Sequence, residues 1–372
     1  MAVEAFMDRA RDLAERGRFT AAPNPLVGVV IARDGRVIGE GWHARAGLEH
    51  AEVAALSANG TDMRGASMYV TLEPCNHHGR TPPCTDSILR AGISRVVIGH
   101  LDPDPRMRGR SVELLRGAGV EVEVLDDPAF ERQNEQFFHY MNTGLPFVHL
   151  KLAATLDGRI AASGGDSKWI TGEAARRRAH ALRAEAGAVL VGAGTVRADD
   201  PSLTARDVPD QPPPLTRIVL DPSLSLDPES QLARSVDEAR VLLFADKTVL
   251  DGREKRLEAL GVEVVGAPRG ENGLDLAYVL AEAGDRGLRG VLVEGGGETA
   301  GRFLRSRFVD KVTVFYAPKI LGADGVPMIG PLGITSVQDA PHFSVSGVEQ
   351  LGDDLAVTFY PRREENDVHR ID

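Results

Sequence analysis

Short apolar stretches alternate with helix-like segments along the first third of this chain, and this alternation restricts the fold more than any other feature. The apolar runs lie at 66–75, 94–102 and 120–125, and segments with helical spacing lie at 49–60, 86–92 and 109–119. Residues 26–43 contain two further apolar runs joined by a polar turn at 33–36, which predicts a β-hairpin. Short strands separated by helices predict a three-layer α/β/α sandwich.

A second series of strands begins near residue 146. The run 147–158 is strand-like, and a helical segment at 172–186 and a strand at 188–194 follow it. Further apolar runs lie at 217–221, 239–246, 262–266, 290–297, 311–318 and 355–360. The 372 residues suit two domains, so we expect a first domain at 1–145 and a second α/β domain at 146–372. The polar segment 126–145 is the expected connector, and the proline-rich stretch 209–216 is an expected exposed loop inside the second domain.

The composition excludes some classes of protein. The net charge is −11, no run of Lys and Arg is long enough to form a basic stripe, and aromatic residues make up only 5% of the chain. Proteins that track polynucleotides need cationic grooves and aromatic stacking surfaces, so we expect no nucleic-acid partner. No stretch approaches the ~18 continuous apolar residues of a membrane span, so we expect no membrane partner. Residues 1–19 have the pattern of an amphipathic helix rather than a signal peptide, and the expected location is the cytoplasm.

Both cysteines of the chain fall within ten residues, downstream of a His-x-Glu pair. Zinc binds imidazole nitrogen and thiolate sulfur, and catalytic zinc sites keep a fourth position open for water. His50, Cys75 and Cys84 therefore predict a catalytic site with one Zn²⁺ per chain. Glu52 follows His50 by two residues, so it can lie beside the open position and transfer a proton from water to a leaving amine. The order His-x-Glu, then Pro-Cys, then Cys is that of zinc nucleobase deaminases.

Two details of this motif leave alternatives open. Eight residues separate Cys75 from Cys84, where zinc nucleobase deaminases have two, so residues 76–83 must loop out and return. His77 and His78 lie in that loop and compete as ligands, and a closed four-ligand site would indicate a zinc-stabilised binding module instead. A buried cysteine pair can also be ordinary core. The conjunction of His-x-Glu with Glu-Pro-Cys favours the catalytic zinc site.

The most specific landmarks of the sequence are HAE at 50–52, TLEPCNHHGRTPPC at 71–84 and KLAATLDGRIA at 151–161. In these landmarks the chain resembles the bifunctional deaminase/reductase family of riboflavin biosynthesis, and the resemblance covers nearly its whole length. The long insert between the cysteines is usual in that family. The resemblance implies a cytidine-deaminase-like N-terminal domain and a dihydrofolate-reductase-like C-terminal domain.

The resemblance also implies two reactions. The N-terminal domain, a hydrolase acting on a cyclic amidine, would deaminate 2,5-diamino-6-ribosylamino-4(3H)-pyrimidinone 5′-phosphate. The C-terminal domain, an oxidoreductase, would use NADPH to reduce the ribosyl group to ribityl and give 5-amino-6-ribitylaminouracil 5′-phosphate. The partner is then a small phosphorylated pyrimidine, and we expect the enzyme to be a homo-oligomer.

The first site needs groups that hold the base and the ribose phosphate of such a substrate. The resemblance places Asn24 beside the base, although an Asn-Pro turn before a strand would explain this residue equally well. Candidates for the ribose-phosphate end are His43, His77, Arg80 and Thr81. A phosphate requires charge-assisted donors, and Arg80 on a glycine-containing loop offers them.

The second domain contains two glycine-rich turns after apolar strands, at 192–194 and 295–297. Glycines allow close backbone approach, and the helix N-terminus that follows offers N–H groups to an anion. Neither turn is a full G-x-G-x-x-G fingerprint, so ordinary strand-to-helix turns remain an alternative. The resemblance assigns NADP contacts to Ala154, Trp169, Thr195, Asp199, Gly296, Gly297, Glu298, Thr299, Ala300, Gly301 and Arg302. It assigns contacts with the phosphorylated substrate to Ser167, Arg183, Leu203, Arg206 and Glu294.

Lys151 stands out in the otherwise apolar strand of the second domain. A lysine in such a strand usually points to solvent. We favour a donor to the sugar oxygen that gains negative charge during hydride transfer, which makes Lys151 and Glu52 the predicted catalytic residues. The rival enzyme hypothesis is a nucleoside or tRNA deaminase fused to an unrelated nucleotide-binding domain.

Overall fold

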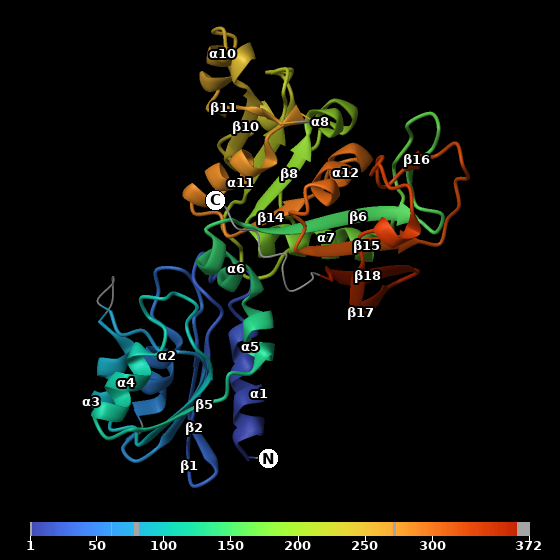
Figure 1. The fold of residues 1–372 in the computed structure, drawn as a ribbon. Helices are drawn as coiled ribbons and strands as arrows, with labels where there is room; N and C mark the ends of the chain where they lie inside the picture. The colour runs from blue at the N-terminus through green and yellow to red at the C-terminus, as the bar shows by residue number, and fades with distance from the viewer. Residues whose placement is uncertain (1, 61, 78–81, 271–272, 363–372) are drawn as a thin grey trace. The chain divides into compact units, whose positions relative to one another are not determined.

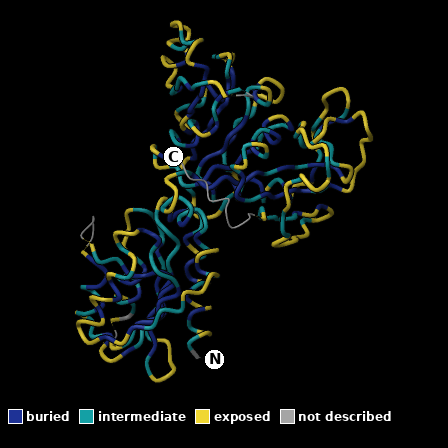
Figure 2. Tube along the Cα trace, in the orientation of Figure 1, coloured by how far each residue is buried: buried dark blue, intermediate teal, exposed yellow. Residues whose placement is uncertain are grey.

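The computed structural model describes residues 2–60, 62–77, 82–270 and 273–362. The chain forms two compact units, Met1–Gly144 with Pro209–Pro212, and Leu145–Val208 with Pro213–Asp372 (Figure 1). The proline-rich stretch is thus divided between the units, where sequence analysis places all of it in the second domain. Each unit has its own sheet, and the buried residues concentrate along the strands (Figure 2). Among the described residues, no helix has both the length and the apolar character needed to cross a bilayer.

The first unit is built on a five-stranded sheet with the order β2-β1-β3-β4-β5. Its strands are β1 (Gly28–Arg33), β2 (Arg36–Trp42), β3 (Ser67–Leu72), β4 (Arg95–His100) and β5 (Glu121–Val124). Strands β1 and β2 pair antiparallel, which confirms the predicted hairpin, and Asp34 and Gly35 in its turn have φ angles of 52° and 75°. Strands β3, β4 and β5 run parallel, so their carboxyl ends lie at one edge of the sheet.

Helices cover both faces of this sheet. Helices α1 (Ala2–Glu15) and α5 (Pro128–Gln133) pack on one face, where Leu13 and Phe130 join a core with Tyr69. Helices α2 (Ala51–Ser57), α3 (Cys84–Arg90) and α4 (Arg110–Gly117) pack on the other, where Ile88 and Leu115 join the second core. A short 3-10 helix, η1 (Ala58–Gly60), follows α2. The predicted three-layer sandwich is confirmed.

Close packing of α2 on the sheet places the residues that precede it. A Cβ atom on Gly41 of β2 would lie 2.5 Å from the carbonyl oxygen of Ala51, so only glycine allows this approach. Helix α2 therefore begins directly over β2, and His50 and Glu52 at its start are held against the sheet.

Most of the segment 126–145, whose polar pattern indicates a connector, belongs to the first unit, which ends at Gly144. It forms α5 and α6 (Glu135–Thr143), two helices that meet at Asn134. The Asn134 side chain accepts a hydrogen bond from the Leu26 backbone N–H at 2.7 Å and donates one to the Leu26 carbonyl at 2.9 Å. This pair of bonds ties the end of the first unit to the segment that leads into β1.

The second unit contains a nine-stranded sheet with the order β11-β10-β9-β8-β14-β6-β15-β18-β17. Every neighbouring pair from β11 to β15 is parallel, and β18 and β17 extend the sheet antiparallel. Strand β14 lies between β8 and β6. The strands are β6 (Phe147–Thr155), β8 (Ala188–Gly192), β9 (Thr216–Leu220), β10 (Val241–Asp246), β11 (Glu263–Ala267), β14 (Gly290–Val293), β15 (Lys311–Ala317), β17 (Phe343–Leu351) and β18 (Asp354–Pro361). Two short antiparallel strand pairs lie outside this sheet. They are β7 (Arg159–Ala161) with β16 (Val326–Pro327), and β12 (Arg269–Gly270) with β13 (Gly273–Leu274).

Helices also cover both faces of the second sheet. Helices α11 (Leu276–Asp285) and α12 (Gly297–Arg305) bury Leu280 and Phe303 against one face. The other face is covered by α7 (Glu173–Ala186), α8 (Ala193–Asp199), α9 (Gln231–Arg234) and α10 (Glu254–Glu258). The remaining short helices are η2 (Lys247–Val249) and η3 (Val337–Asp339). The α/β class predicted for the second domain is confirmed.

Candidate active sites

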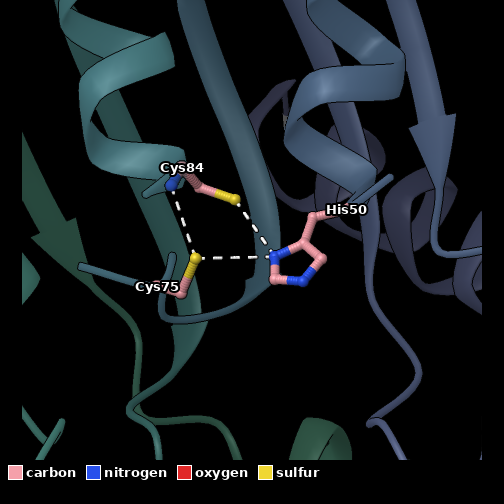
Figure 3. Close-up of side chains that lie close together, drawn as sticks. All are labelled: His50, Cys75 and Cys84. Carbon is pink, nitrogen blue, oxygen red and sulfur yellow. Dashed lines mark hydrogen bonds between the residues drawn. The ribbon is translucent and has the colours of Figure 1, made fainter. Parts of the chain in front are cut away.

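Three elements of the first unit bring His50, Cys75 and Cys84 together (Figure 3). His50 caps the start of α2, Cys75 follows the end of β3, and Cys84 is the first residue of α3. The Nδ1 atom of His50 lies 3.2 Å from the Sγ atom of Cys84 and 3.5 Å from that of Cys75. Around a tetrahedral zinc ion with bonds of roughly 2.0–2.3 Å, neighbouring ligand atoms stand about 3.5 Å apart. The three side chains therefore fit a zinc ion.

The two cysteines differ in charge state. The hydrogen bond from the Cys84 thiol lowers the pKa of Cys75 to about 4, with further lowering by His50, although burial opposes the shift. The Cys75 thiolate in turn raises the pKa of Cys84, and burial adds to that rise. The bond to Cys75 raises the pKa of His50. Cys75 is thus in the thiolate form that binds zinc, whereas Cys84 would release its proton on binding the metal.

Glu52 lies in the first turn of α2 beside this cluster. Its side chain is buried, and its carboxyl group interacts with the Cys84 thiol. Burial raises the pKa of Glu52 to about 7, and the negative charge on Cys75 adds to the rise. A carboxyl group with a pKa near neutrality both accepts and releases a proton readily.

Asn24 and His43 form a hydrogen-bonded pair next to the cluster. The Nδ1 atom of His43 lies 3.0 Å from the carbonyl oxygen of Glu49, so Nδ1 carries the proton. The Nε2 atom is then an acceptor for the Asn24 side-chain amide at 3.0 Å. The ring of His43 also packs edge-on against that of His50, with centroids 5.6 Å apart. The structure thus brings two predicted substrate residues to the metal ligands.

The remaining residues predicted for the first site lie in the insert between the cysteines. His77 is exposed in the structure. Arg80 and Thr81, and the alternative ligand His78, lie outside the described residues. Among the described residues, the cluster of His50, Cys75 and Cys84 is the one group whose ligand atoms lie close enough to share an ion.

Two acidic residues near Cys75 were not singled out from the sequence. Glu73 is buried and accepts hydrogen bonds from the backbone N–H groups of Asp102, Gly109 and Ser111 and from the Ser111 hydroxyl. Burial raises the pKa of Asp102 to about 6, with an added contribution from Glu73. Both residues follow neighbouring parallel strands, β3 and β4, and this shared position at the carboxyl edge is the signal that could have found them.

The two glycine-rich turns of the second unit lie side by side, because β8 and β14 are parallel neighbours. The Thr195 hydroxyl accepts a hydrogen bond from the Gly296 N–H at 3.3 Å and so joins the turns. A Cβ on Gly295 would overlap the Thr299 side chain, whereas one on Gly296 would meet only the Thr195 hydroxyl, at 3.9 Å. The space beside Gly296 at the start of α12 is therefore open, as the binding of a pyrophosphate at a helix N-terminus requires.

A buried ion cluster joins three residues predicted for the second site. The Nζ atom of Lys151 lies 3.5 Å from Oε2 of Glu294, and the Lys151 side chain is only 15% exposed. Arg183 donates two hydrogen bonds to Glu294, at 2.5 and 3.1 Å, and a third to the Thr204 carbonyl at 2.8 Å. Burial alone would raise the pKa of Glu294, but attraction to Arg183 and Lys151 lowers it to about 2. Lys151 therefore does not point to solvent, and Glu294 carries a negative charge.

Helix α7 also holds the loop that carries Leu203 and Arg206. His180, one helical turn before Arg183, forms a hydrogen bond through Nδ1 with the Thr204 carbonyl at 2.9 Å. Leu203 is buried with a φ angle of 50°, and the Arg206 N–H lies 3.3 Å from the same His180 nitrogen. His180 is a further residue of this site that was not predicted, although its spacing of three from Arg183 places both on one helix face.

The other predicted residues of the second site have varied surroundings. Ala154 is buried on β6, and Asp199 ends helix α8. Ser167 and Trp169 lie in the loop between β7 and α7, where Ser167 is half-buried and Trp169 exposed. The residues of α12 that sequence analysis assigns to the cofactor include buried Gly297, Thr299, Ala300 and Gly301 and exposed Glu298.

Comparison with known proteins identifies two families along the chain. The family model described as "RibD C-terminal domain" matches residues 146–357. The family model described as "Cytidine and deoxycytidylate deaminase zinc-binding region" matches residues 1–100. The chain is 43% identical over 355 residues to a protein of Aquifex aeolicus named "Riboflavin biosynthesis protein RibD", and the match covers 95% of this chain and 97% of that protein.

Solved structures extend the similarity to the fold. The structure of Acinetobacter baumannii RibD, form 1, has a TM-score of 0.88 and 34% identity, covering 97% of this chain and 99% of the other. A diaminohydroxyphosphoribosylaminopyrimidine deaminase/5-amino-6-(5-phosphoribosylamino)uracil reductase of Thermotoga maritima has a TM-score of 0.85 and 38% identity, with the same coverage.

Proposed function

Because the chain belongs to the RibD family of riboflavin biosynthesis proteins, we propose that its two clusters carry the two reactions of a deaminase/reductase. The protein is a bifunctional enzyme that uses zinc in its deaminase domain and NADPH in its reductase domain. It deaminates 2,5-diamino-6-ribosylamino-4(3H)-pyrimidinone 5′-phosphate and then reduces the ribosyl group to give 5-amino-6-ribitylaminouracil 5′-phosphate. The convergence of His50, Cys75 and Cys84 beside Glu52 carries the proposal.

In the deaminase domain, His50, Cys75 and Cys84 would hold the zinc ion. A bound zinc ion would lower the pKa of the attacking water. Glu52 would accept a proton from the attacking water and deliver it to the amine, which leaves the pyrimidine as ammonia. The burial of Glu52 beside Cys75 and Cys84 supports this role, because solvent does not compete for the proton.

The pair of Asn24 and His43 orients the pyrimidine base, so we assign His43 to the base through Asn24 and not to the ribose-phosphate end for which the sequence makes it a candidate. The Glu49 carbonyl fixes the tautomer of His43, and His43 then fixes which way the Asn24 amide turns. The Asn24 carbonyl oxygen stays available to accept a hydrogen bond from the base. His77, Arg80 and Thr81 are assigned to the ribose-phosphate end of the substrate.

In the reductase domain, Lys151 donates to the sugar oxygen that gains charge when NADPH, once bound, supplies its hydride. Glu294 and Arg183 hold the Lys151 ammonium group in place through the buried ion cluster. The proposed cofactor contacts are Ala154, Trp169, Thr195, Asp199, Gly296, Gly297, Glu298, Thr299, Ala300, Gly301 and Arg302. The proposed substrate contacts are Ser167, Arg183, Leu203, Arg206 and Glu294.

We also propose the domain boundaries and the oligomeric state of the protein. The deaminase domain spans 1–145 and the reductase domain 146–372. The enzyme is a homo-oligomer, which is supported by the open edge strand β17, where Val345 and Val348 are 61% and 63% exposed. An exposed edge strand presents backbone N–H and C=O groups with which a strand of another chain can pair. The two cysteines of the protein are free thiols, which suits the reducing conditions of the cytoplasm.

Ammonia release tests the proposed function. The purified protein should release ammonia from the pyrimidine ribosylamine phosphate, and should oxidise NADPH only after that step. Cytidine and tRNA serve as competing substrates. Ammonia release from either of these, without release from the pyrimidine phosphate, would instead support a nucleoside or tRNA deaminase.

A further inference from the structure

Trp169 is a large aromatic residue that the structure fixes in an exposed position. Its side chain is 63% exposed, although it lies between β7 and α7 in a loop with several anchors. The guanidinium carbon of Arg176, in the first turns of α7, lies 4.5 Å from the centroid of the Trp169 ring. One face of the indole is thus covered by a cation from its own unit.

The backbone around Trp169 is tied down at three points. The Nζ atom of Lys319 donates to the Trp169 carbonyl at 2.6 Å, and the Gly172 N–H donates to the buried Asp354 carboxylate at 2.6 Å. Arg176 itself donates through Nη1 to the Thr171 carbonyl at 2.7 Å. The indole is therefore exposed because the loop holds it there, and not because the loop lacks contacts.

These anchors place Trp169 at the carboxyl edge of the second sheet. Lys319 follows β15, and its carbonyl accepts a hydrogen bond from the Leu156 N–H, just after β6. Ala154 on β6 lies at the same edge, as do the glycine-rich turns after β8 and β14. Ligands of open parallel sheets bind at this edge.

We infer that Arg176 is a positioning residue that holds the Trp169 indole as a wall for the nicotinamide ring of NADPH. The inference rests on the assignment of Trp169 to the cofactor site made above. Arg176 stacks under one face of the indole and bonds the backbone two residues from it, so it fixes both the ring and its loop. The other face then meets a flat ring with little loss of side-chain entropy.

The test compares Arg176→Met with Arg177→Met, a substitution of the next residue on the same helix. Arg177 pairs with Glu173 on the surface and serves as the matched control. NADPH binding to the whole protein is followed by quenching of Trp169 emission in a Trp42→Phe background, since the chain has two tryptophans. The free energy of a cation–π contact such as that between Arg176 and Trp169 corresponds to a factor of up to about five in an equilibrium constant. We expect Arg176→Met to weaken NADPH binding by about that factor, and Arg177→Met to change it less than twofold.

Further readouts separate positioning from a general loss of structure. Acrylamide should quench Trp169 more strongly in Arg176→Met, and Arg176→Lys should recover part of the NADPH affinity because it restores the cation. In the protein with both tryptophans, KM for NADPH should rise while kcat changes little. Unchanged NADPH affinity in Arg176→Met would overturn the inference.

Trp169→Phe separates the role of Arg176 from the cofactor assignment of Trp169, and KM for NADPH is its readout because this variant lacks the reporting indole. If Trp169→Phe weakens NADPH binding and Arg176→Met does not, the positioning role is wrong and the cofactor assignment stands. If neither variant weakens binding, Trp169 is not a cofactor contact, and both the assignment and the inference fail.

Discussion

The Nδ1 atom of His50 and the Sγ atom of Cys84 lie 3.2 Å apart, although 34 positions separate the residues in the sequence. Both residues begin helices, α2 and α3, that pack on the same face of the first sheet. Two helix N-termini and the end of β3 thus meet at one point. Two helices and a strand fix the backbone positions of all three ligands. Substitutions of the ligand side chains should therefore change the chemistry of the site while its backbone arrangement is kept.

Replacing Glu52 with Gln tests its proton transfer. The amide keeps the size of the side chain but cannot accept and release a proton, so zinc should stay bound while deamination falls by about 10²–10⁴-fold or more. Metal content and ammonia release are measured on the same sample, and NADPH oxidation with deaminated substrate serves as the control. Deamination at a rate near that of the unmodified protein would show that Glu52 is not the proton carrier.

Replacing either cysteine with serine tests the ligand set. A hard hydroxyl oxygen in place of soft sulfur, in a site with three protein ligands, should abolish tight zinc binding. Metal analysis after gel filtration of Cys75→Ser and Cys84→Ser measures this loss, and reduction of the deaminated intermediate should persist. If either variant retains one zinc per chain, the histidines of the insert are ligands instead.

Parts of this arrangement could be predicted from the sequence. The hairpin turn and the short alternating elements follow from local patterns, because strand and helix periodicity and turn residues act over a few positions. The convergence of His50, Cys75 and Cys84 could be expected because zinc chemistry requires those side chains together.

Other parts depend on tertiary contacts that no local pattern contains. The hydrogen bond between Asn24 and His43 and the ion pair between Arg183 and Glu294 join distant segments through the sheet order. The place of the segment 126–145 also depends on tertiary contacts, although its polar helical pattern indicates a connector. Phe130 and Asn134 anchor it in the first unit through contacts with residues near the N-terminus.

The reductase domain should act without the deaminase domain. The second unit has its own nine-stranded sheet and core and contains no cysteine, so a fragment of residues 146–372 should reduce the deaminated intermediate without zinc. NADPH oxidation by the fragment is measured with and without a chelator. Circular dichroism checks that the fragment is folded. Inhibition of the folded fragment by the chelator would contradict the assignment of zinc to the first domain alone.

The buried carboxylate of Glu294 should make the second unit sensitive to acid. Its folded pKa of about 2 is below the usual value of 4.5, so its stabilisation is present above about pH 4.5 and is lost as the pH falls through 2. Glu294→Gln leaves Arg183 and Lys151 buried without their counter-charge, which costs roughly 3 kcal/mol at pH 7. Unfolding followed through Trp169 emission, in Trp42→Phe protein, should show a flatter dependence on pH for Glu294→Gln. The surface variant Glu173→Gln should keep the original dependence, and equal slopes for the original protein and Glu294→Gln would refute the prediction.

Replacing Lys151 with Met tests the donor proposed for hydride transfer. Methionine keeps the aliphatic length and removes the charge, so NADPH affinity should hold while kcat falls by about 10²-fold or more. Lys247→Met, at an exposed position, controls for the loss of one positive charge. Normal turnover, or a loss confined to NADPH binding, would show that Lys151 is not the donor. In that case Glu294 would not replace it as an acid, because its pKa of about 2 leaves it ionised at neutral pH, and the proton would have to come from water.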